Sequence, residues 1–181
     1  MSKYLDINYL KKHCTKIHAF GLGFIQIKLG DINRVHIYCK EAGLTTQEEE
    51  IHNHRYNFTS LVLKGEIENK IYEVKPDPQG LFQQLNEACN PDVPKDMESL
   101  LVTEPKLVSR FVTAKGSEYF LDKDTFHRVQ ATEGTITVLT RGLVVKAQAQ
   151  IVSPLNQKLT CPFSVNLPEN KLWLLVEEKI K

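Results

Sequence analysis

The sequence lacks an excess of charge of either sign. Lysine and arginine together number 23 against 22 aspartates and glutamates, which leaves a formal net charge of +1 at pH 7. Proteins that bind along nucleic acid or an anionic membrane surface carry basic residues in excess, clustered on one face. We therefore expect neither nucleic acid nor a membrane among the partners of this chain, and we expect a small-molecule substrate instead.

Long apolar runs and paired cysteines are also missing. No uninterrupted apolar stretch approaches the ~20 residues of a membrane helix, and residues 1–6 carry no apolar run of the kind found in a secretory signal. The four cysteines, Cys14, Cys39, Cys89 and Cys161, form no CxxC pair and have no zinc-ribbon spacing. Because scattered cysteines in a chain without a signal are usually reduced, we expect a cytoplasmic protein.

The chain is long enough for one domain with a real core. It has 181 residues, of which 41% are hydrophobic, so we expect a single domain over 1–181 with its core at about 22–150. Short β-type runs separated by turn residues predict an all-β fold, a jelly-roll barrel, with short peripheral helices near the N- and C-termini. The runs lie at 24–30, 35–39, 51–74, 107–112, 119–121, 126–129, 135–139 and 143–145. The helices are expected at 7–16 and 168–180.

Two of these segments carry more specific expectations. In 24–30 the apolar residues Ile25, Ile27 and Leu29 alternate with polar ones, the pattern of a strand with one face buried and the other in solvent. The segment 76–105 holds five of the eight prolines and is predicted as an insertion between strands, with a short helix at 81–88.

Two histidines stand two residues apart, His52 and His54, in a segment with strand character. Side chains at i and i+2 of a strand point to the same face, so both imidazoles can reach one point in space. Neutral imidazole is a good ligand for Fe, Zn, Cu or Ni. The pair is therefore a candidate for two ligands of one metal ion.

The spacing around this pair resembles the first motif of the cupin family, G-x5-H-x-H-x3,4-E-x6-G. Phe58 stands in the position of the glutamate, Gly65 follows after the expected six residues, and Thr46 stands in the position of the opening glycine. Further along, a glycine, two aspartates and a histidine match the spacing of the second motif, G-x5-P-x-G-x2-H-x3-N, but Ala131 stands in the place of its asparagine. These four are Gly116, Asp122, Asp124 and His127.

The resemblance implies a cupin barrel in which His52, His54 and His127 bind a divalent metal ion. A three-histidine set without the glutamate is similar to the thiol dioxygenases of the cysteine dioxygenase type, as is the sequence His127-Arg128-Val129. The implied cofactor is Fe(II), with Zn or Ni as alternatives, and the implied activity is dioxygenation of a small substrate such as a thiol. Dimerisation through edge strands is a further implication of the family.

Other residues near the motifs are candidates for substrate contacts. Alternation along the strand would place Tyr56, Phe58 and Ser60 on the face of the two histidines, where Tyr56 takes a catalytic role and the other two line the pocket. Arg55 and Arg141 are candidate anion clamps, because a planar guanidinium matches a carboxylate or phosphate in a two-pronged contact. Alternation would turn Arg55 outward, which favours a structural role for it, whereas Arg141 follows a run that leads toward the pocket.

Two functions therefore remain open from the sequence. One is a metal-dependent oxidoreductase resembling a dioxygenase. The other is a non-catalytic or metal-free cupin that binds a small ligand or a partner protein, which the missing Glu, Pro, Gly and Asn of the two motifs favour. The presence of all three histidines at ligand spacing favours the enzyme.

Overall fold

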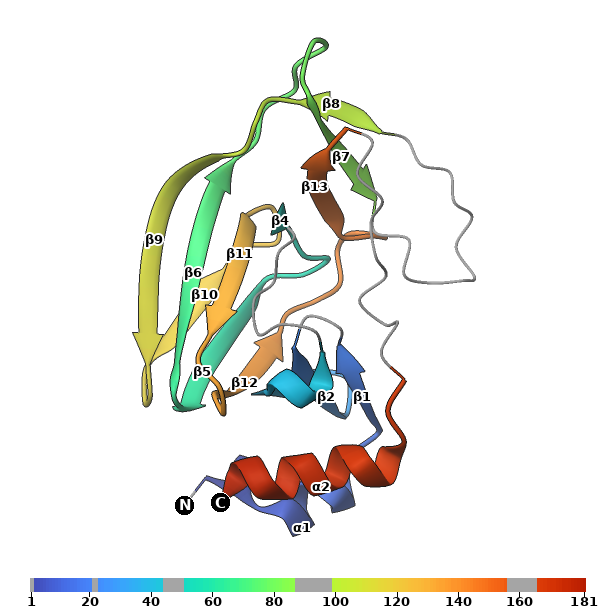
Figure 1. The fold of residues 1–181 in the computed structure, drawn as a ribbon, viewed down its shortest axis with the longest axis vertical. Helices are drawn as coiled ribbons and strands as arrows, with labels where there is room; N and C mark the ends of the chain where they lie inside the picture. The colour runs from blue at the N-terminus through green and yellow to red at the C-terminus, as the bar shows by residue number, and fades with distance from the viewer. Residues whose placement is uncertain (1, 21–22, 44–50, 87–98, 156–165) are drawn as a thin grey trace.

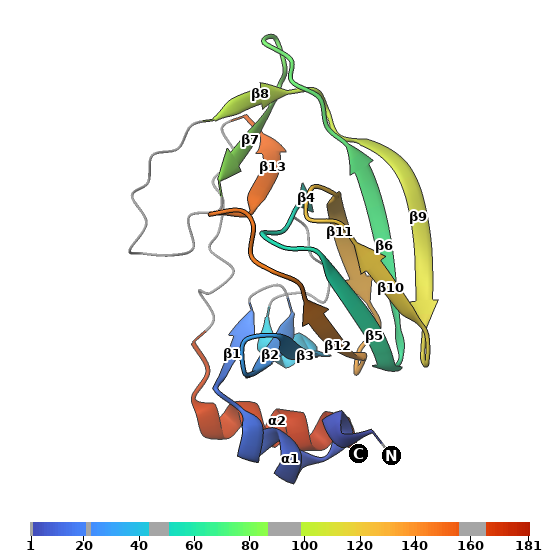
Figure 2. The same ribbon diagram turned by 180° about the vertical axis from the view of Figure 1, so that it is seen from behind.

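The computed structural model describes residues 2–20, 23–43, 51–86, 99–155 and 166–181. Within them the chain forms strands arranged in two antiparallel sheets, with a few short helices (Figures 1 and 2). The strands are β1 (Lys16–Phe20), β2 (Phe24–Leu29), β3 (Asn33–Tyr38), β4 (Ile51–His52), β5 (Phe58–Lys64), β6 (Glu66–Glu73), β7 (Phe82–Asn86), β8 (Leu100–Val102), β9 (Lys106–Ala114), β10 (Glu118–Leu121), β11 (Phe126–Ala131), β12 (Ile136–Arg141) and β13 (Gln150–Pro154).

The two sheets have the mixed strand order of a jelly-roll-like fold. The six-stranded sheet runs β1-β2-β3-β12-β5-β10, and the seven-stranded sheet runs β8-β7-β13-β4-β11-β6-β9. Strands from both ends of the chain thus lie next to strands from its middle, as β12 does between β3 and β5. The predicted all-β architecture is confirmed, and β1 and β13 extend the sheets at both ends of the expected core.

The helices lie side by side at one end of the molecule, where both termini also lie (Figures 1 and 2). They are α1 (Ile7–His13) and α2 (Glu169–Ile180), with short 3-10 turns at Lys3–Leu5 and Lys40–Ala42. The α1 helix begins at Asp6, whose carboxylate accepts a hydrogen bond from the backbone N–H of Asn8 at 2.9 Å. In the described part of the chain, no helix combines the length and apolar character that crossing a membrane requires.

The helices cover the outer face of the six-stranded sheet. Branched aliphatic side chains from three neighbouring strands form this face and pack with Leu10 of α1 and with Leu172 and Val176 of α2. They are Ile25 and Ile27 of β2, Val35 and Ile37 of β3, and Ile136 and Val138 of β12. This cluster is a conventional apolar core, and burial of such side chains is the main force that holds the sheet and helices together.

The inner face of the same sheet turns toward the seven-stranded sheet and is also covered. Gln26 is 4% exposed and His36 is 9% exposed, and the Gln26 amide nitrogen lies 3.0 Å from His36 Nε2. The prediction that β2 has one face in solvent is therefore wrong. Polar and apolar residues alternate in the same way whether the polar face of a strand is buried or exposed to solvent. The pattern alone therefore could not distinguish the two cases.

Two other local predictions need correction. The helix predicted at 81–88 is a strand over its described part, because β7 pairs with both β13 and β8. The segment 76–105 is thus part of the seven-stranded sheet at both of its described ends, while residues 87–98 lie outside the described ones. The strand that begins at Ile51 is also short, since β4 ends at His52 and leaves His54 in an irregular segment.

Candidate metal centre

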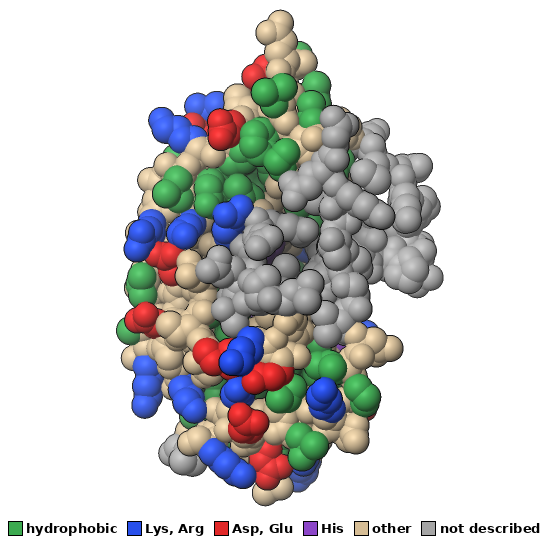
Figure 3. Space-filling model, viewed as in Figure 1, with side chains coloured by type: hydrophobic (Ala, Val, Ile, Leu, Met, Phe, Trp, Pro, Cys, Tyr) green, Lys and Arg blue, Asp and Glu red, His purple; other side chains and the backbone are tan. Residues whose placement is uncertain are grey.

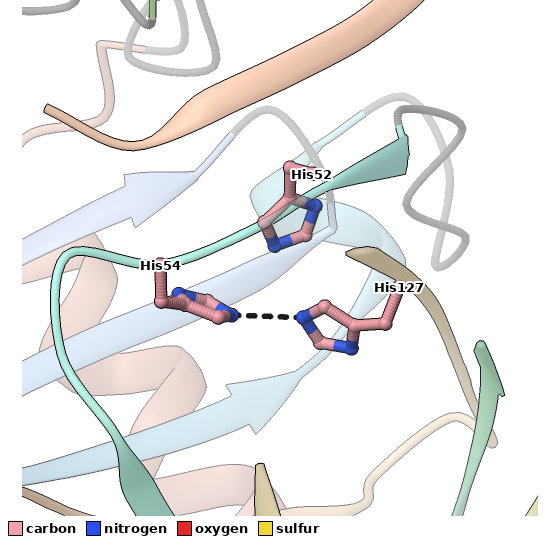
Figure 4. Close-up of side chains that lie close together, drawn as sticks. All are labelled: His52, His54 and His127. Carbon is pink, nitrogen blue, oxygen red and sulfur yellow. Dashed lines mark hydrogen bonds between the residues drawn. The ribbon is translucent and has the colours of Figure 1, made fainter. Parts of the chain in front are cut away.

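Three imidazoles converge between the sheets (Figure 4). One ring nitrogen from each of His52, His54 and His127 lies within 4.8 Å of the other two. The Nε2 atoms of His54 and His127 are 2.8 Å apart, and the ring centroids of His52 and His127 are 4.7 Å apart. The three candidate ligands of the sequence motifs are therefore brought together at one point.

Strand pairing delivers two of the three rings. His52 of β4 lies directly opposite His127 of β11 in the antiparallel register, so the two side chains share one face of the sheet. In this way two residues that are far apart in the sequence become neighbours. The register of a two-residue strand thus positions two of the three candidate ligands.

His54 is positioned by the segment that follows β4. The preceding residue, Asn53, is buried and exchanges two hydrogen bonds of 2.8 Å with Gln150, one from its amide to the Gln150 side chain and one to its Oδ1 from the Gln150 N–H. The His54 N–H itself donates to the Lys123 carbonyl at 3.2 Å. These bonds replace the sheet ladder that ends at His52 and hold the His54 ring toward the other two.

A buried asparagine fixes the orientation of the His127 ring. Nδ1 of His127 lies 3.0 Å from Oδ1 of Asn69 on β6, and since an amide oxygen only accepts, the ring nitrogen carries the proton. His127 Nε2 is then the nitrogen with the free lone pair, and it points toward His54. A hydrogen bond of this kind to the remote nitrogen is the usual support of a metal-bound histidine.

The electrostatics of the group favour neutral rings. Burial, with a further contribution from His52, lowers the pKa of both His54 and His127 well below the ordinary value for histidine. Neutral rings offer lone pairs, which is what a metal ligand requires. Two nitrogens bound at about 2.1 Å to one ion and at right angles to each other lie about 3.0 Å apart, close to the 2.8 Å between His54 and His127. The donor set fits a divalent cation.

The aromatic candidates lie beside the triad. The Phe58 ring is 4.8 Å from the His54 ring in an edge-on arrangement, and the Tyr56 ring is 6.1 Å from it. Both side chains are buried, and Ser60 is buried further along β5. Phe58 occupies the place that the cupin motif gives to a glutamate, so an apolar ring stands where a fourth, charged ligand is expected. Within the described ranges of the chain, the site therefore offers three neutral ligands.

The two candidate arginines lie in different surroundings. Arg55 is exposed and its Nε donates to the Lys146 carbonyl at 3.3 Å, so the structure does not bring it together with the imidazoles. Arg141 lies at the end of β12 with its guanidinium carbon 5.6 Å from the Tyr56 ring centre. Its Nε donates a hydrogen bond to the Asp31 carbonyl.

Sequence reasoning missed Asn69 and Arg34. Arg34 is half-buried on β3, with its guanidinium carbon 5.1 Å from the Tyr56 ring centre and a hydrogen bond to that side chain. Its signal in the sequence was the alternation of Arg34 with His36, polar residues on one face of a strand. Asn69 had no such signal, because a single asparagine in a strand says nothing of which ring lies above it.

Comparison with known proteins gives distant likenesses. No family model matches the chain, and no curated protein does. Among solved structures, the Fe(II) form of HppE is 15% identical with a TM-score of 0.38, over 66% of this chain and 50% of that one. Hydroquinone 1,2-dioxygenase PnpCD with Cd²⁺ and 4-hydroxybenzonitrile is 11% identical with a TM-score of 0.39, over 77% of this chain and 73% of that one. Drosophila melanogaster CENP-C bound to CAL1 is 11% identical with a TM-score of 0.38, over 70% and 80%.

Fold and triad together are consistent with a cupin. The chain spans about half the length of the HppE chain it matches. Because all three likenesses have TM-scores below 0.5, the function of this chain has to be argued from its own residues. What those residues establish is an all-β fold of two sheets with a group of three histidines, two half-buried and one buried, whose donor atoms fit a divalent metal ion.

Proposed function

We propose that the protein is a cytoplasmic, mononuclear metal-dependent oxygenase in which His52, His54 and His127 hold Fe(II). The observation that carries the proposal is the convergence of three ring nitrogens within 4.8 Å in the space between the sheets. The low pKa of His54 and His127 supports it, because these rings are ready to bind a cation without first losing a proton to solvent.

Among the described residues no carboxylate joins the three histidines, which favours an anionic substrate atom at the metal. Three neutral ligands leave the full 2+ charge of the ion and several open positions, and a small thiol bound as its thiolate would offset one of the two positive charges. When bound, Fe(II) supplies the activation of dioxygen that no protein side chain provides. Phe58 keeps water from one side of the site, while Tyr56 and Arg141 orient the polar end of the substrate.

Elemental analysis tests the metal assignment. Protein without an affinity tag should contain close to one equivalent of iron, and the His54→Ala variant should contain none, because two imidazoles bind a divalent ion far more weakly than three. His13→Ala, which removes an exposed histidine of α1, is the matched control and should keep its iron. Zinc or nickel in the wild type would keep the site but contradict the oxygenase. No metal after anaerobic loading with Fe(II) would sink the assignment.

One observation favours the second candidate function, a metal-free cupin that binds a small ligand or a partner protein. His54 Nε2 and His127 Nε2 lie within direct hydrogen-bond distance, so one neutral ring can donate to the other and the pair is satisfied without an ion. The metal analysis separates the two functions. If the triad is only a pocket lining, His54→Ala and wild type will have the same metal content, both near zero.

A further inference from the structure

Three basic residues lie side by side on the inner face of the six-stranded sheet. In the antiparallel register Lys16 of β1 is directly opposite Lys28 of β2, and Lys28 is directly opposite Arg34 of β3. Neighbouring strands are about 4.8 Å apart, so the three side chains begin at successive steps of that size. Lys28 and Arg34 are half-buried and Lys16 is exposed at the sheet edge. We call these three residues the cationic row.

The cationic row has no acidic partner among the described residues. Like charges directly opposite on paired strands repel and destabilise a sheet. The same three charges act on His18, which neighbours them on β1. Burial, and then Lys28, Lys16 and Arg34, lowers the pKa of His18 to about 4. Lys179 of α2 lies in a different environment. Lys179 contacts Glu41, Glu133 and Glu178.

The surface shown in Figure 3 differs from the cationic row in its pattern of charge. In Figure 3 basic and acidic side chains are interspersed over the lower part of the face that is shown, as the net charge of +1 leads one to expect. The cationic row is therefore a local cluster of positive charge among the described residues. A protein that keeps such a repulsion in its folded state gives up stability there, and a bound anion would recover it.

The cationic row leads toward the triad. Arg34, its innermost member, stacks over the Tyr56 ring, and Arg141 lies 5.6 Å from the centre of that ring. Tyr56 in turn lies beside His54, with 6.1 Å between the ring centres. A molecule with one end between Lys28 and Arg34 could thus extend past Tyr56 to the three imidazoles.

We propose that the cationic row binds a doubly charged oxyanion, a phosphoryl group, at one end of the substrate. A phosphate carries about −1.5 to −2 at pH 7 and three acceptor oxygens, which suits one guanidinium in a two-pronged contact and one or two ammonium groups beside it. The inference deepens the proposed function by naming its substrate class, and as a statement about the substrate it rests on that function. The binding of the anion itself does not depend on the metal.

Calorimetric titration with inorganic phosphate tests the site, in sodium chloride of matched ionic strength so that screening is constant. We expect wild-type protein to bind phosphate and Lys28→Met to bind it about tenfold more weakly, since one charge-assisted contact is lost. Lys171→Met, which removes an exposed lysine of α2, should bind as wild type does. Acetate, with one charge, should bind more weakly than phosphate. Equal phosphate affinity in wild type and Lys28→Met, or no binding by wild type, would overturn the proposal.

Thermal unfolding gives a second readout with opposite signs. Without phosphate, Lys28→Met should unfold at a higher temperature than wild type, because the repulsion with Lys16 and Arg34 is relieved. With phosphate, wild type should gain stability and the variant should gain little. Equal gains in both proteins would contradict the site.

His54→Ala separates this inference from the proposed function. It should lose the metal but still bind phosphate, because His54 is outside the cationic row. If wild type holds no metal yet binds phosphate through Lys28, the oxygenase fails and the anion site stands. If wild type holds iron but does not bind phosphate, the substrate class fails and the metal centre stands.

Discussion

The two faces of the six-stranded sheet are made by the same strands but differ in how many polar and charged side chains they carry. Toward the helices, β2, β3 and β12 present mainly branched aliphatic side chains, and six of them are 5% exposed or less: Ile25, Ile27, Val35, Ile37, Ile136 and Val138. Toward the other sheet, the same strands mix apolar side chains with polar and basic ones. The apolar ones are Phe24, Tyr38 and Leu139, and the others include Gln26, Lys28, Arg34, His36 and Thr137. Both faces are covered, so burial alone does not explain the difference.

The comparison shows where stability and function are placed in this fold. Apolar burial between sheet and helices holds the molecule together, and each such residue contributes roughly 1.5–3 kcal/mol. Polar groups between the sheets gain little net stability, because each hydrogen bond replaces one to water. Residues that a fold keeps at such cost are candidates for function. The cationic row lies on this inner face, and Phe58 of the same sheet lies 4.8 Å from the His54 ring of the triad.

The largest effect should come from a cavity on the outer face. Ile37→Ala removes most of a fully buried side chain from the cluster beneath the helices and should lower the free energy of unfolding by about 2–5 kcal/mol. Denaturation with urea measures it. Ile32→Ala, at a residue that is 55% exposed, is the control and should change the free energy by less than about 0.5 kcal/mol. A similar loss in both variants would mean that the outer face is not the main core.

A smaller effect should follow from removing the buried acceptor of the triad. Asn69→Ala leaves the His127 Nδ1–H without its partner and frees the ring to turn, so we expect metal affinity to fall about 10–100-fold. Competition with a chelator measures it. Asn69→Asp keeps an acceptor and should recover part of the affinity, and Asn33→Ala, at a half-buried asparagine of β3, should leave it unchanged. Loss of affinity in the Asn33 variant as well would point to a general weakening of the fold.

The smallest effect should be a change in acid stability. Burial, then Arg34 and His18, lowers the pKa of His36 from 6.5 to about 3. Between these values the unfolded chain binds a proton that the folded protein does not, so the His36 contribution to stability is full above pH 6.5 and is lost as the pH falls toward 3. His36→Gln should flatten the decline of stability over that window, as measured by urea unfolding at successive pH values.

His13→Gln serves as the reference for loss of an exposed histidine. It should retain the wild-type slope in the same titration. If the dependence of stability on pH is the same in His36→Gln as in wild type, then His36 takes up a proton in the folded protein. That result would contradict the burial of His36 on the inner face.

The architecture could be predicted from the sequence because alternation and turns are local signals. The strands β2 and β3 were predicted to within a few residues of their observed bounds. The spacing of the two motifs predicted the barrel. The predictions that were wrong relied on a local sequence pattern in a segment whose structure depends on its neighbours in the fold. Residues 82–86 were predicted as part of a helix, but they form β7 because β13 and β8 offer them edges to pair with. Pairing of this kind is not written in the segment itself.

The site could be predicted only as far as its motifs reach. His52, His54 and His127 were found because their spacing is a sequence property, and they converge. Arg34, Lys28 and Asn69 were not found, because their roles depend on register between strands and on which face the second sheet covers. A one-residue change of register would turn each of them to the opposite face. The sequence offered one indication of a polar inner face, which was the alternation of polar residues along three successive strands.

The hydrogen bond between His54 and His127 joins residues that are 73 positions apart in the chain. In a fold built mainly from non-local pairings, such contacts form late, after the intervening strands have found their partners. A metal ion could therefore not guide the early steps of folding, since its three ligands do not yet exist as a group. It would act on the reverse reaction, slowing the separation of β4 from β11 and so lengthening the lifetime of the native state while leaving the folding rate unchanged.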